Sequence, residues 1–166
     1  MVKPDLKEEF ISVFEENIGI ILKISRLYAQ TKQDREDLLN DIALELWKSY
    51  PRFKSNSKVS TWIYRVSLNT SMNYKRRASA GKTSVNEAIE IDYSDRLTEN
   101  DANSLIDALY DCIADLDELN KAIIILYLDG NTHEEISQIT GISKSNVGTR
   151  ISRIKEQLRS IASDKL

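Results

Sequence analysis

The chain has 166 residues, of which 41% are hydrophobic and 30% are charged, and its formal net charge is −3. This balance is typical of a soluble globular protein and excludes a chain that is disordered for lack of apolar residues. No apolar run approaches the roughly 20 residues of a membrane-spanning helix, and the acidic N-terminus lacks the basic start and apolar run of a signal peptide, so we expect a cytoplasmic protein without membrane insertion.

Helical periodicity dominates the chain, and no stretch of useful length alternates as a strand would. A first helix is predicted from Phe10 to Gln30, although Gly19 weakens its middle. A second helix begins at Asp34, which can cap it, and it ends before Pro51. A polar loop follows this second helix.

A third helix is predicted from Ser60 or Thr61 to about Arg77. Residues 81–101 have no sustained period, which is typical of a flexible linker, and the end of this stretch is acidic. Four more helices are predicted from about Ala102 onward.

The expected fold class is therefore all-α, with two small helical domains joined by a flexible linker. The predicted domains are residues 1–80 and 102–166, and the last helix is expected to end near Ser160.

The charges are segregated along the chain. Residues 51–82 carry 8 basic and no acidic side chains, whereas residues 83–120 carry 1 basic and 11 acidic side chains. A basic stretch without carboxylates is a candidate surface for a polyanion, because cations that neutralise phosphates release condensed counterions. The alternative is a basic face that is merely solvated. Nucleic acid is favoured because aromatic rings, which can stack on unpaired bases, are interleaved with the cations. These aromatic residues are Phe53, Trp62, Tyr64 and Tyr74.

A helix-turn-helix pattern lies in the C-terminal part of the chain. A short helix is predicted for Thr132–Thr140, and it stops at Gly141, which can adopt the positive φ of a tight turn. Ser143 is a good N-cap for the helix that follows. In that helix, apolar residues recur at spacings of 4, 3, 4 and 3 and form one narrow core-facing seam. The seam residues are Val147, Ile151, Ile154, Leu158 and Ile161.

The other faces of this last helix carry short polar and basic side chains, and up to Ser160 only Glu156 is acidic. Such groups can reach base edges and phosphates in a major groove, which favours a recognition helix over the alternative, an ordinary amphipathic surface helix. Gly148 lies inside the predicted helix, where it costs ~1 kcal/mol against alanine but would let the helix approach a phosphate or a partner backbone closely.

Enzyme motifs are matched only in part. The fragment HEEIS has Ser137 where a zinc protease needs its second histidine, and AGKTS has Arg76 where a P-loop needs its first glycine. A single cysteine, Cys112, forms no internal disulfide, and together with the single histidine, His133, it supplies no structural zinc site by itself. We therefore expect no catalytic residue, no metal and no cofactor, and we expect Cys112 in the core.

Three segments resemble RNA polymerase sigma factors of the sigma-70 family, in its extracytoplasmic-function (ECF) subgroup. The segments are DREDLLNDIALELWKSYPRF at residues 34–53, STWIYRVSLNTSMNYKRR at residues 60–77 and DGNTHEEISQITGISKSNVGTRISRIKEQLR at residues 129–159. They occur in the order of the family and with the expected short linker, so that the resemblance covers nearly the whole chain.

The resemblance implies a function without catalysis, in which the chain gives core RNA polymerase its promoter specificity, in a stress or envelope-signal response. Residues 1–80 would be sigma domain 2, which binds the polymerase and recognises and melts the −10 element. Residues 102–166 would be sigma domain 4, whose helix-turn-helix recognises the −35 element. The implied partners are the β′ clamp helices and β-flap of core polymerase, promoter DNA and an anti-sigma factor.

The resemblance also assigns site residues. The polymerase-binding stripe corresponds to Asp37, Asn40, Asp41 and Leu44. The loop before the third helix would capture a base flipped out of the non-template strand, next to Asn69, while nearby cations contact phosphates. The residues assigned to the −10 region are Phe53, Lys54, Ser55, Asn56, Lys58, Arg65, Asn69, Asn73, Lys75, Arg76 and Arg77. The residues assigned to the −35 region are Thr132, Lys144, Ser145, Asn146, Thr149, Arg150, Arg153 and Lys155.

Some positions depart from the family or fit it in two ways. Gly148 replaces a lysine found in many relatives and removes a phosphate contact. Trp62 is expected in the core rather than on a base. The apolar run from Ile123 to Leu128 exceeds one seam, so part of it is expected at the β-flap. The alternative function is a stand-alone helix-turn-helix regulator that binds palindromic duplex DNA without polymerase.

Overall fold

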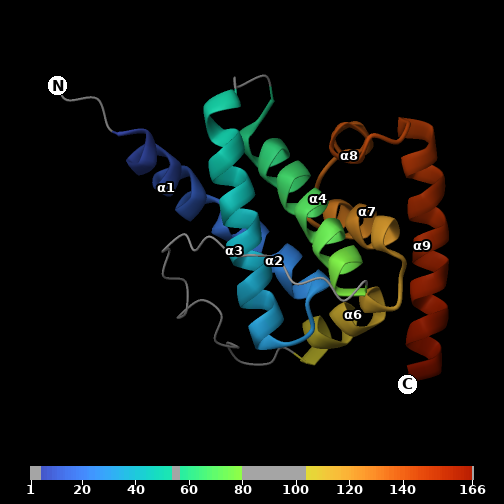
Figure 1. Cartoon of the computed structure of the whole chain (residues 1–166). Coiled ribbons are helices and arrows are strands. Elements are labelled where there is room, and N and C mark those ends of the chain that lie inside the picture. Colours follow the sequence, from blue (N-terminus) through green and yellow to red (C-terminus); the bar gives the residue numbers. More distant parts are fainter. Residues whose placement is uncertain (1–4, 54–56, 80–103, 166) are drawn as a thin grey trace. The chain divides into compact units, whose positions relative to one another are not determined.

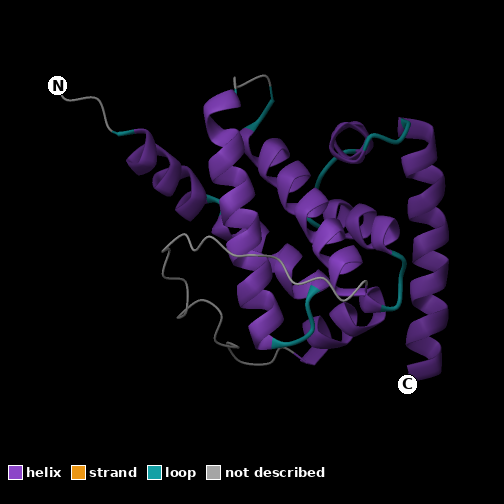
Figure 2. Cartoon of the chain, viewed as in Figure 1, coloured by secondary structure: helices purple, strands orange, loops and turns teal. Residues whose placement is uncertain are grey.

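The computed structural model describes residues 5–53, 57–79 and 104–165. Within these ranges every regular element is a helix, which confirms the predicted all-α class (Figures 1 and 2). The chain divides into two compact units, Met1–Leu97 and Thr98–Leu166, and each has its own set of helices.

The N-terminal unit is a bundle of three helices with a fourth helix, the first in the chain, attached. Its elements are α1 (Leu6–Glu16), α2 (Ile18–Tyr28), α3 (Lys32–Ser49), the 3-10 turn η1 (Tyr50–Arg52) and α4 (Val59–Ser79). The helices α2, α3 and α4 pack against one another, and Figure 1 shows α3 and α4 side by side. The core of these helices is mainly aliphatic, and Ile21, Ile42 and Ile63 are buried in it.

The predicted single helix from Phe10 to Gln30 is wrong, because the structure has two helices that are separated at Asn17. Asn17 has φ −115° and ψ 12°, and its side-chain Nδ2 donates a 2.9 Å hydrogen bond to the carbonyl oxygen of Val13. Short polar side chains that bond to the backbone in this way compete with a continuing helix. Phe14 and Ile18, on either side of the break, are both buried.

The start of α3 also differs from the prediction, since Thr31 caps this helix and Asp34 does not. The Oγ1 of Thr31 accepts a 3.1 Å hydrogen bond from the backbone N–H of Asp34, and Thr31 itself is extended. Asp34 lies instead in the first turn, where a carboxylate is favoured by the helix dipole.

A row of aromatic rings joins α1, η1 and α4. The ring centroid of Phe10 lies 5.2 Å from that of Trp47 and 5.5 Å from that of Tyr50. Tyr50 in turn contacts Trp62 at 6.0 Å, and Phe53 stacks on Trp62 at 4.8 Å with an interplanar angle of 22°. Trp62 is only 8% exposed, which confirms its predicted place in the core.

The C-terminal unit contains the four predicted helices. They are α6 (Ser104–Ala114), α7 (Glu118–Leu128), α8 (His133–Thr140) and α9 (Lys144–Lys165). The predicted seam of α9 is confirmed for Val147, Ile151 and Ile154, which are buried, whereas Leu158 and Ile161 are half-buried. The helix extends past the predicted end at Ser160, and Cys112 is buried as expected.

The apolar run of α7 is mostly interior. This helix contacts α6, α8 and α9, and Ile123, Ile124, Ile125 and Leu126 are all buried. Of the surplus apolar residues that were expected at a partner surface, only Leu128 is well exposed, at 50%. Packing on several sides therefore explains most of the surplus.

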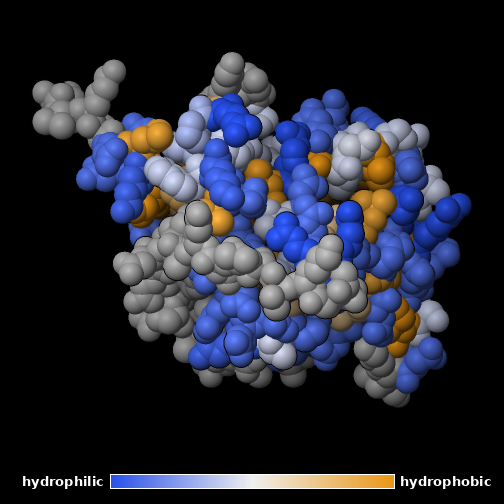
Figure 3. All heavy atoms as spheres, in the orientation of Figure 1, coloured by the Kyte–Doolittle hydropathy of each residue, from blue (hydrophilic) through white to orange (hydrophobic). Residues whose placement is uncertain are grey.

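Hydrophilic residues predominate on the face shown in Figure 3, and hydrophobic residues appear between them in several separate patches. Leu105, Ile106 and Leu109 form an exposed apolar group on α6. Among the residues that the structure describes, no helix combines the length and apolar character needed to span a membrane.

Candidate functional site

A groove of about 450 Å³ runs between α3 and α4 in the N-terminal unit. The residues from α3 that line it are Asp41, Leu44, Glu45, Lys48 and Ser49, and those from α4 are Val66, Asn69, Thr70, Asn73 and Arg77. Each side includes members of a set that was predicted separately. Asp41 and Leu44 belong to the polymerase-binding stripe on α3, and Asn69, Asn73 and Arg77 belong to the −10 residues on α4. The packing of α3 on α4 brings these members of the two sets together.

The α4 side of the groove forms a polar stripe. Arg65, Asn69, Asn73 and Arg77 follow one another at intervals of four residues, which places them on one face of the helix, and all four are exposed. Lys58 and Arg76 are exposed as well, and Lys75 is half-buried. Lys54, Ser55 and Asn56 of the predicted −10 loop lie outside the described residues.

The predicted polymerase-binding stripe on α3 is acidic, and its residues Asp41 and Leu44 line the groove. Asp37, Asn40, Asp41 and Leu44 are all half-buried. Burial, together with the neighbouring charges of Asp34 and Glu36, raises the pKa of Asp37 above its ordinary value. Repulsion of this kind favours a cationic partner, which would relieve it.

Tyr74, one of the four rings that were expected to stack on bases, connects α4 to the first turn of α3. Its hydroxyl group donates a 3.4 Å hydrogen bond to Oδ1 of Asp34. Burial and the nearby carboxylates of Asp34 and Asp37 raise the pKa of Tyr74 to about 12. The hydroxyl therefore stays protonated to a higher pH than that of an ordinary tyrosine, and it acts as a hydrogen-bond donor to α3.

The four aromatic rings of the basic stretch are not equally accessible. Trp62 and Tyr64 are buried, so neither offers a free face to a base. Phe53 and Tyr74 are half-exposed. Of these two, Phe53 already stacks on Trp62, which fixes the plane of its ring.

The helix-turn-helix geometry in the C-terminal unit agrees with the predicted local structure. Thr132 caps α8 by accepting a 3.1 Å hydrogen bond from a backbone N–H in its first turn. Gly141 ends α8 with φ 83°, and Ser137 donates its hydroxyl hydrogen to the carbonyl oxygen of Ile142 in the turn. Ser143 then caps α9 by accepting a 3.2 Å bond, as predicted.

One side of α9 is exposed and polar, and we call it the polar face. Lys144, Ser145, Asn146, Thr149 and Arg153 are all exposed there. Ser152, which the sequence prediction did not include, is also exposed there, three residues after Thr149.

Two of the predicted −35 residues point elsewhere. Arg150 Nη1 donates a 3.2 Å hydrogen bond to Oδ1 of Asn120, on α7. Lys155 Nζ donates a 2.9 Å bond to the hydroxyl oxygen of Tyr127, also on α7. The structure therefore separates these two cations from the polar face of α9.

Gly148 faces α8. A Cβ atom added to Gly148 would lie 3.5 Å from Cε1 and Nδ1 of the His133 ring, which is ordinary van der Waals contact. The space beside this glycine is therefore already bordered by a side chain of the same unit.

Comparison with known proteins gives two family matches in the order of the two units. The Sigma-70 region 2 model matches residues 13–81, and the Sigma-70, region 4 model matches residues 106–158. The first match contains the groove between α3 and α4, and the second contains the helix-turn-helix.

Individual relatives agree with these matches. The ECF RNA polymerase sigma-E factor of Haemophilus influenzae is 26% identical over 140 residues, which cover 77% of this chain and 74% of the relative. The sigma-E factor of Escherichia coli K12 is 28% identical over 137 residues, covering 75% and 72%. The ECF sigma factor SigM of Mycobacterium tuberculosis is 22% identical over 149 residues, covering 90% and 74%.

Two solved structures share the fold. The sigma factor RpoE from Bartonella quintana, in complex with the anti-sigma factor NepR, superposes with a TM-score of 0.64 at 19% identity, covering 95% of this chain and 96% of that chain. CnrH in complex with the cytosolic domain of CnrY gives 0.69 at 16% identity, covering 96% and 91%. Since the two sigma-70 regions match in order and together span most of the chain, the protein belongs to the sigma-70 family of RNA polymerase sigma factors, in its ECF group.

Proposed function

We propose that the chain binds core RNA polymerase and directs it to specific promoters, acting in the cytoplasm, where bacterial transcription takes place. The observation that carries this proposal is the presence of two polar surfaces, one in each sigma region: the groove between α3 and α4 and the polar face of α9. Both are binding surfaces, and the proposed function requires no catalytic group from this chain.

The polymerase would bind along α3 through Asp37, Asn40, Asp41 and Leu44. The carboxylates and the amide can accept hydrogen bonds from arginine and lysine side chains of the β′ clamp helices, and bonds to charged groups are the stronger ones. Leu44 adds an apolar contact at the edge of the groove. The pKa of Asp37 is raised first by burial and then by the charges of Asp34 and Glu36, and this supports the assignment, since a cationic partner would stabilise the ionised carboxylate.

The −10 element would be held by the α4 side of the groove and the loop before α4. Arg65, Arg76 and Arg77 are placed to neutralise phosphates, which position DNA without specifying its sequence. Asn69 and Asn73 carry both a donor and an acceptor and can bond to the edge of an unpaired base. The half-exposed ring of Phe53 can support the face of such a base.

The −35 element would be recognised by the polar face of α9 in the major groove. Lys144, Asn146 and Arg153 carry the groups best suited to base edges and phosphates. Thr132 lies at the N-terminus of α8, where backbone N–H groups and the helix dipole favour a phosphate.

Two further partners follow from the same family assignment. The exposed apolar group on α6 and Leu128 on α7 suit a contact with the β-flap of core polymerase. An anti-sigma factor would hold the chain until a stress or envelope signal releases it. Support for this partner comes from the RpoE relative, which was solved with the anti-sigma factor NepR.

The test is co-elution of the purified chain with bacterial core RNA polymerase on a sizing column. The wild type and a Glu16→Lys control, which reverses an exposed charge on α1, are expected to co-elute, whereas Asp41→Lys is expected to elute alone. Co-elution of all three would refute the α3 docking face. Failure of the wild type to co-elute, with tight binding of the free chain to palindromic DNA, would instead support a stand-alone regulator.

A further inference from the structure

Two polar contacts connect α9 to α7 beside the buried seam. Arg150 bonds to Asn120 in the first turn of α7 at 3.2 Å. Lys155 bonds to the hydroxyl oxygen of Tyr127 in the last turn of α7 at 2.9 Å, and its Nζ lies 4.6 Å from the ring centroid. In each contact a cationic side chain of α9 donates a hydrogen bond to a polar side chain of α7.

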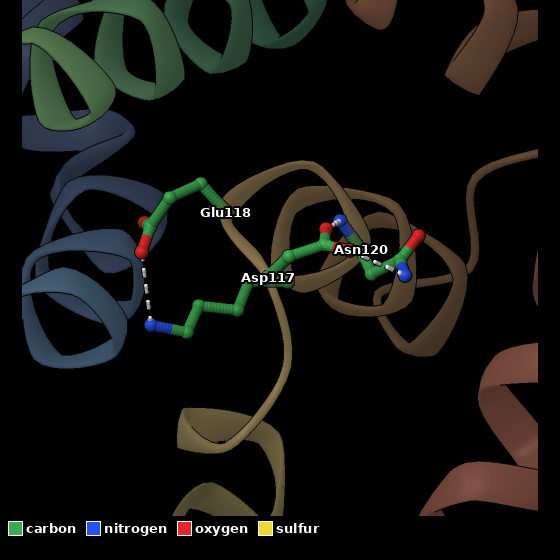
Figure 4. Close-up of polar contacts among 4 residues, drawn as sticks. Asp117, Glu118 and Asn120 are labelled. Atoms are coloured by element: carbon green, nitrogen blue, oxygen red, sulfur yellow. Dashed lines mark hydrogen bonds and ion pairs between the residues drawn. The ribbon is translucent and has the colours of Figure 1, made fainter.

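The partner of Arg150 is itself held in one orientation by Asp117, the N-cap of α7. Asp117 Oδ1 accepts a 2.8 Å bond from the backbone N–H of Asn120, and Oδ2 accepts a 3.1 Å bond from Asn120 Nδ2 (Figure 4). Because the amide nitrogen faces Asp117, the amide oxygen faces Arg150. The opposite orientation would place two donor groups, the amide and the guanidinium, against each other.

The Arg150 guanidinium is only partly accessible. Its Nε is buried and has no hydrogen-bond partner among the described residues, while its Nη1 is occupied by Asn120. Binding a phosphate would require this side chain to leave a charge-assisted bond and to cross the edge of the seam. The side chain is thus placed for a contact within the unit rather than for one with DNA.

The positions of the two contacts around α9 determine how they restrain this helix. At about 100° per residue, Arg150 and Lys155 lie on opposite sides of the seam formed by Val147, Ile151 and Ile154. Apolar packing has little directionality, whereas hydrogen bonds lose strength quickly when they are misaligned. A polar contact on each side of the seam therefore resists rotation of α9 in either direction.

We infer that Arg150, with Asn120 as its partner, is a positioning residue that fixes the rotation of α9 and so aims Thr149 and Arg153 at the DNA. This inference rests on the proposed function, because it assumes that the polar face of α9 recognises the −35 element. Lys155 and Tyr127 play the same part on the other side of the seam. Arg150 acts through α7 and does not touch DNA.

The experiment uses holoenzyme reconstituted from the full chain and bacterial core RNA polymerase. The probe is a duplex promoter fragment that the wild-type holoenzyme selects from a randomised library, and Kd is measured over a series of salt concentrations. The salt slope is the slope of the logarithm of the binding constant against the logarithm of the salt concentration. Arg153→Ala, the matched arginine control, should lower the magnitude of this slope by about one, as the loss of one phosphate contact does. Arg150→Ala should weaken binding about tenfold with an unchanged slope.

A double-mutant cycle separates positioning from direct contact. Asn120→Ala should match Arg150→Ala, and the double variant should be no weaker than either single variant, since both remove the same interaction. Discrimination between the selected fragment and one with a scrambled −35 element should fall as well, which a purely structural role would not cause. A lower salt slope for Arg150→Ala, or additive losses in the cycle, would overturn the inference.

Two milder variants keep the test decisive if Arg150→Ala fails to fold. Asp117→Asn keeps a good N-cap but removes the charge that orients Asn120, and Tyr127→Phe keeps the ring but removes the acceptor for Lys155. Both should reduce discrimination at an unchanged salt slope, and undiminished discrimination in both would refute the inference. If the wild-type holoenzyme selects no fragment, the proposed function fails and this inference fails with it. A lower salt slope for Arg150→Ala would instead overturn this inference alone.

Discussion

Replacing Gly148 by alanine should stabilise the C-terminal unit without weakening promoter binding. Gly148 lies inside α9 and its φ is not in the left-handed region, so alanine meets no backbone strain there. The added Cβ would touch only the His133 ring, at an ordinary 3.5 Å. The expected gain is the helix-propensity difference, roughly 0.8–1.0 kcal/mol. For a unit of this size that corresponds to a rise in Tm of about 4–8 °C.

Gly141→Ala is the matched control, and it should lower the stability of the C-terminal unit. Nothing lies within 4 Å of a Cβ placed at Gly141, so the whole effect comes from its φ of 83°. Forcing an alanine into the left-handed region costs roughly 1–2 kcal/mol, and the Tm of the unit should fall. The two substitutions add the same methyl group to the same helix-turn-helix, so their opposite signs separate backbone strain from side-chain packing.

The assay is calorimetric unfolding of both variants, followed by the affinity of the reconstituted holoenzyme for a selected promoter fragment. Affinity of the Gly148→Ala holoenzyme should stay within about twofold of wild type, because the Cβ faces α8. A lower Tm would show that the reasoning from propensity and contact distance is wrong. A tenfold loss of affinity at a raised Tm would show that this glycine is needed for close approach to DNA.

Three other predictions concern single side chains. Because the folded-state pKa of Tyr74 is raised to about 12, its bond to Asp34 should stabilise the fold below about pH 10 and lose this effect as the pH rises through 12. The Tm difference between wild type and Tyr74→Phe should therefore shrink across that window, and a difference that grows would contradict the assignment. Asn69→Ala should slow promoter opening roughly tenfold with little change in closed-complex affinity, measured by permanganate footprinting and filter binding; equal losses would argue against a flipped-base contact. Thr132→Ala should cost ~1 kcal/mol through loss of the α8 cap, and an unchanged Tm would refute that role.

Periodicity predicted the helices better than their ends. The apolar stripes of α3, α4 and α9 were long enough to identify these helices, because burial on one side of a helix imposes a period of 3.6 residues. The break at Asn17 was missed, since an asparagine can face solvent in a helix or bond to the backbone and end it. Which of the two occurs depends on where Phe14 and Ile18 must be buried, and that is a tertiary property.

The candidate site divides in the same way. The resemblance to sigma factors assigned residues on each helix, but it left the stripe of Asp41 and the residues around Asn69 as unrelated surfaces. Their meeting in one groove depends on how α3 packs against α4. The hydrogen bond from Tyr74 to Asp34 also depends on this packing, because the two residues are 40 positions apart in the chain.

By itself, the sequence determined the helical class, the local caps and turn around Gly141, and the three motifs of the sigma factor family. These features depend on residues close together in the chain, and so they can be inferred from spacing. Tertiary structure alone decided which cations of α9 face solvent. Arg150 and Arg153 are identical in chemistry and three residues apart, yet one bonds to Asn120 on α7 and the other is exposed, because only packing determines which side of a helix meets its neighbour.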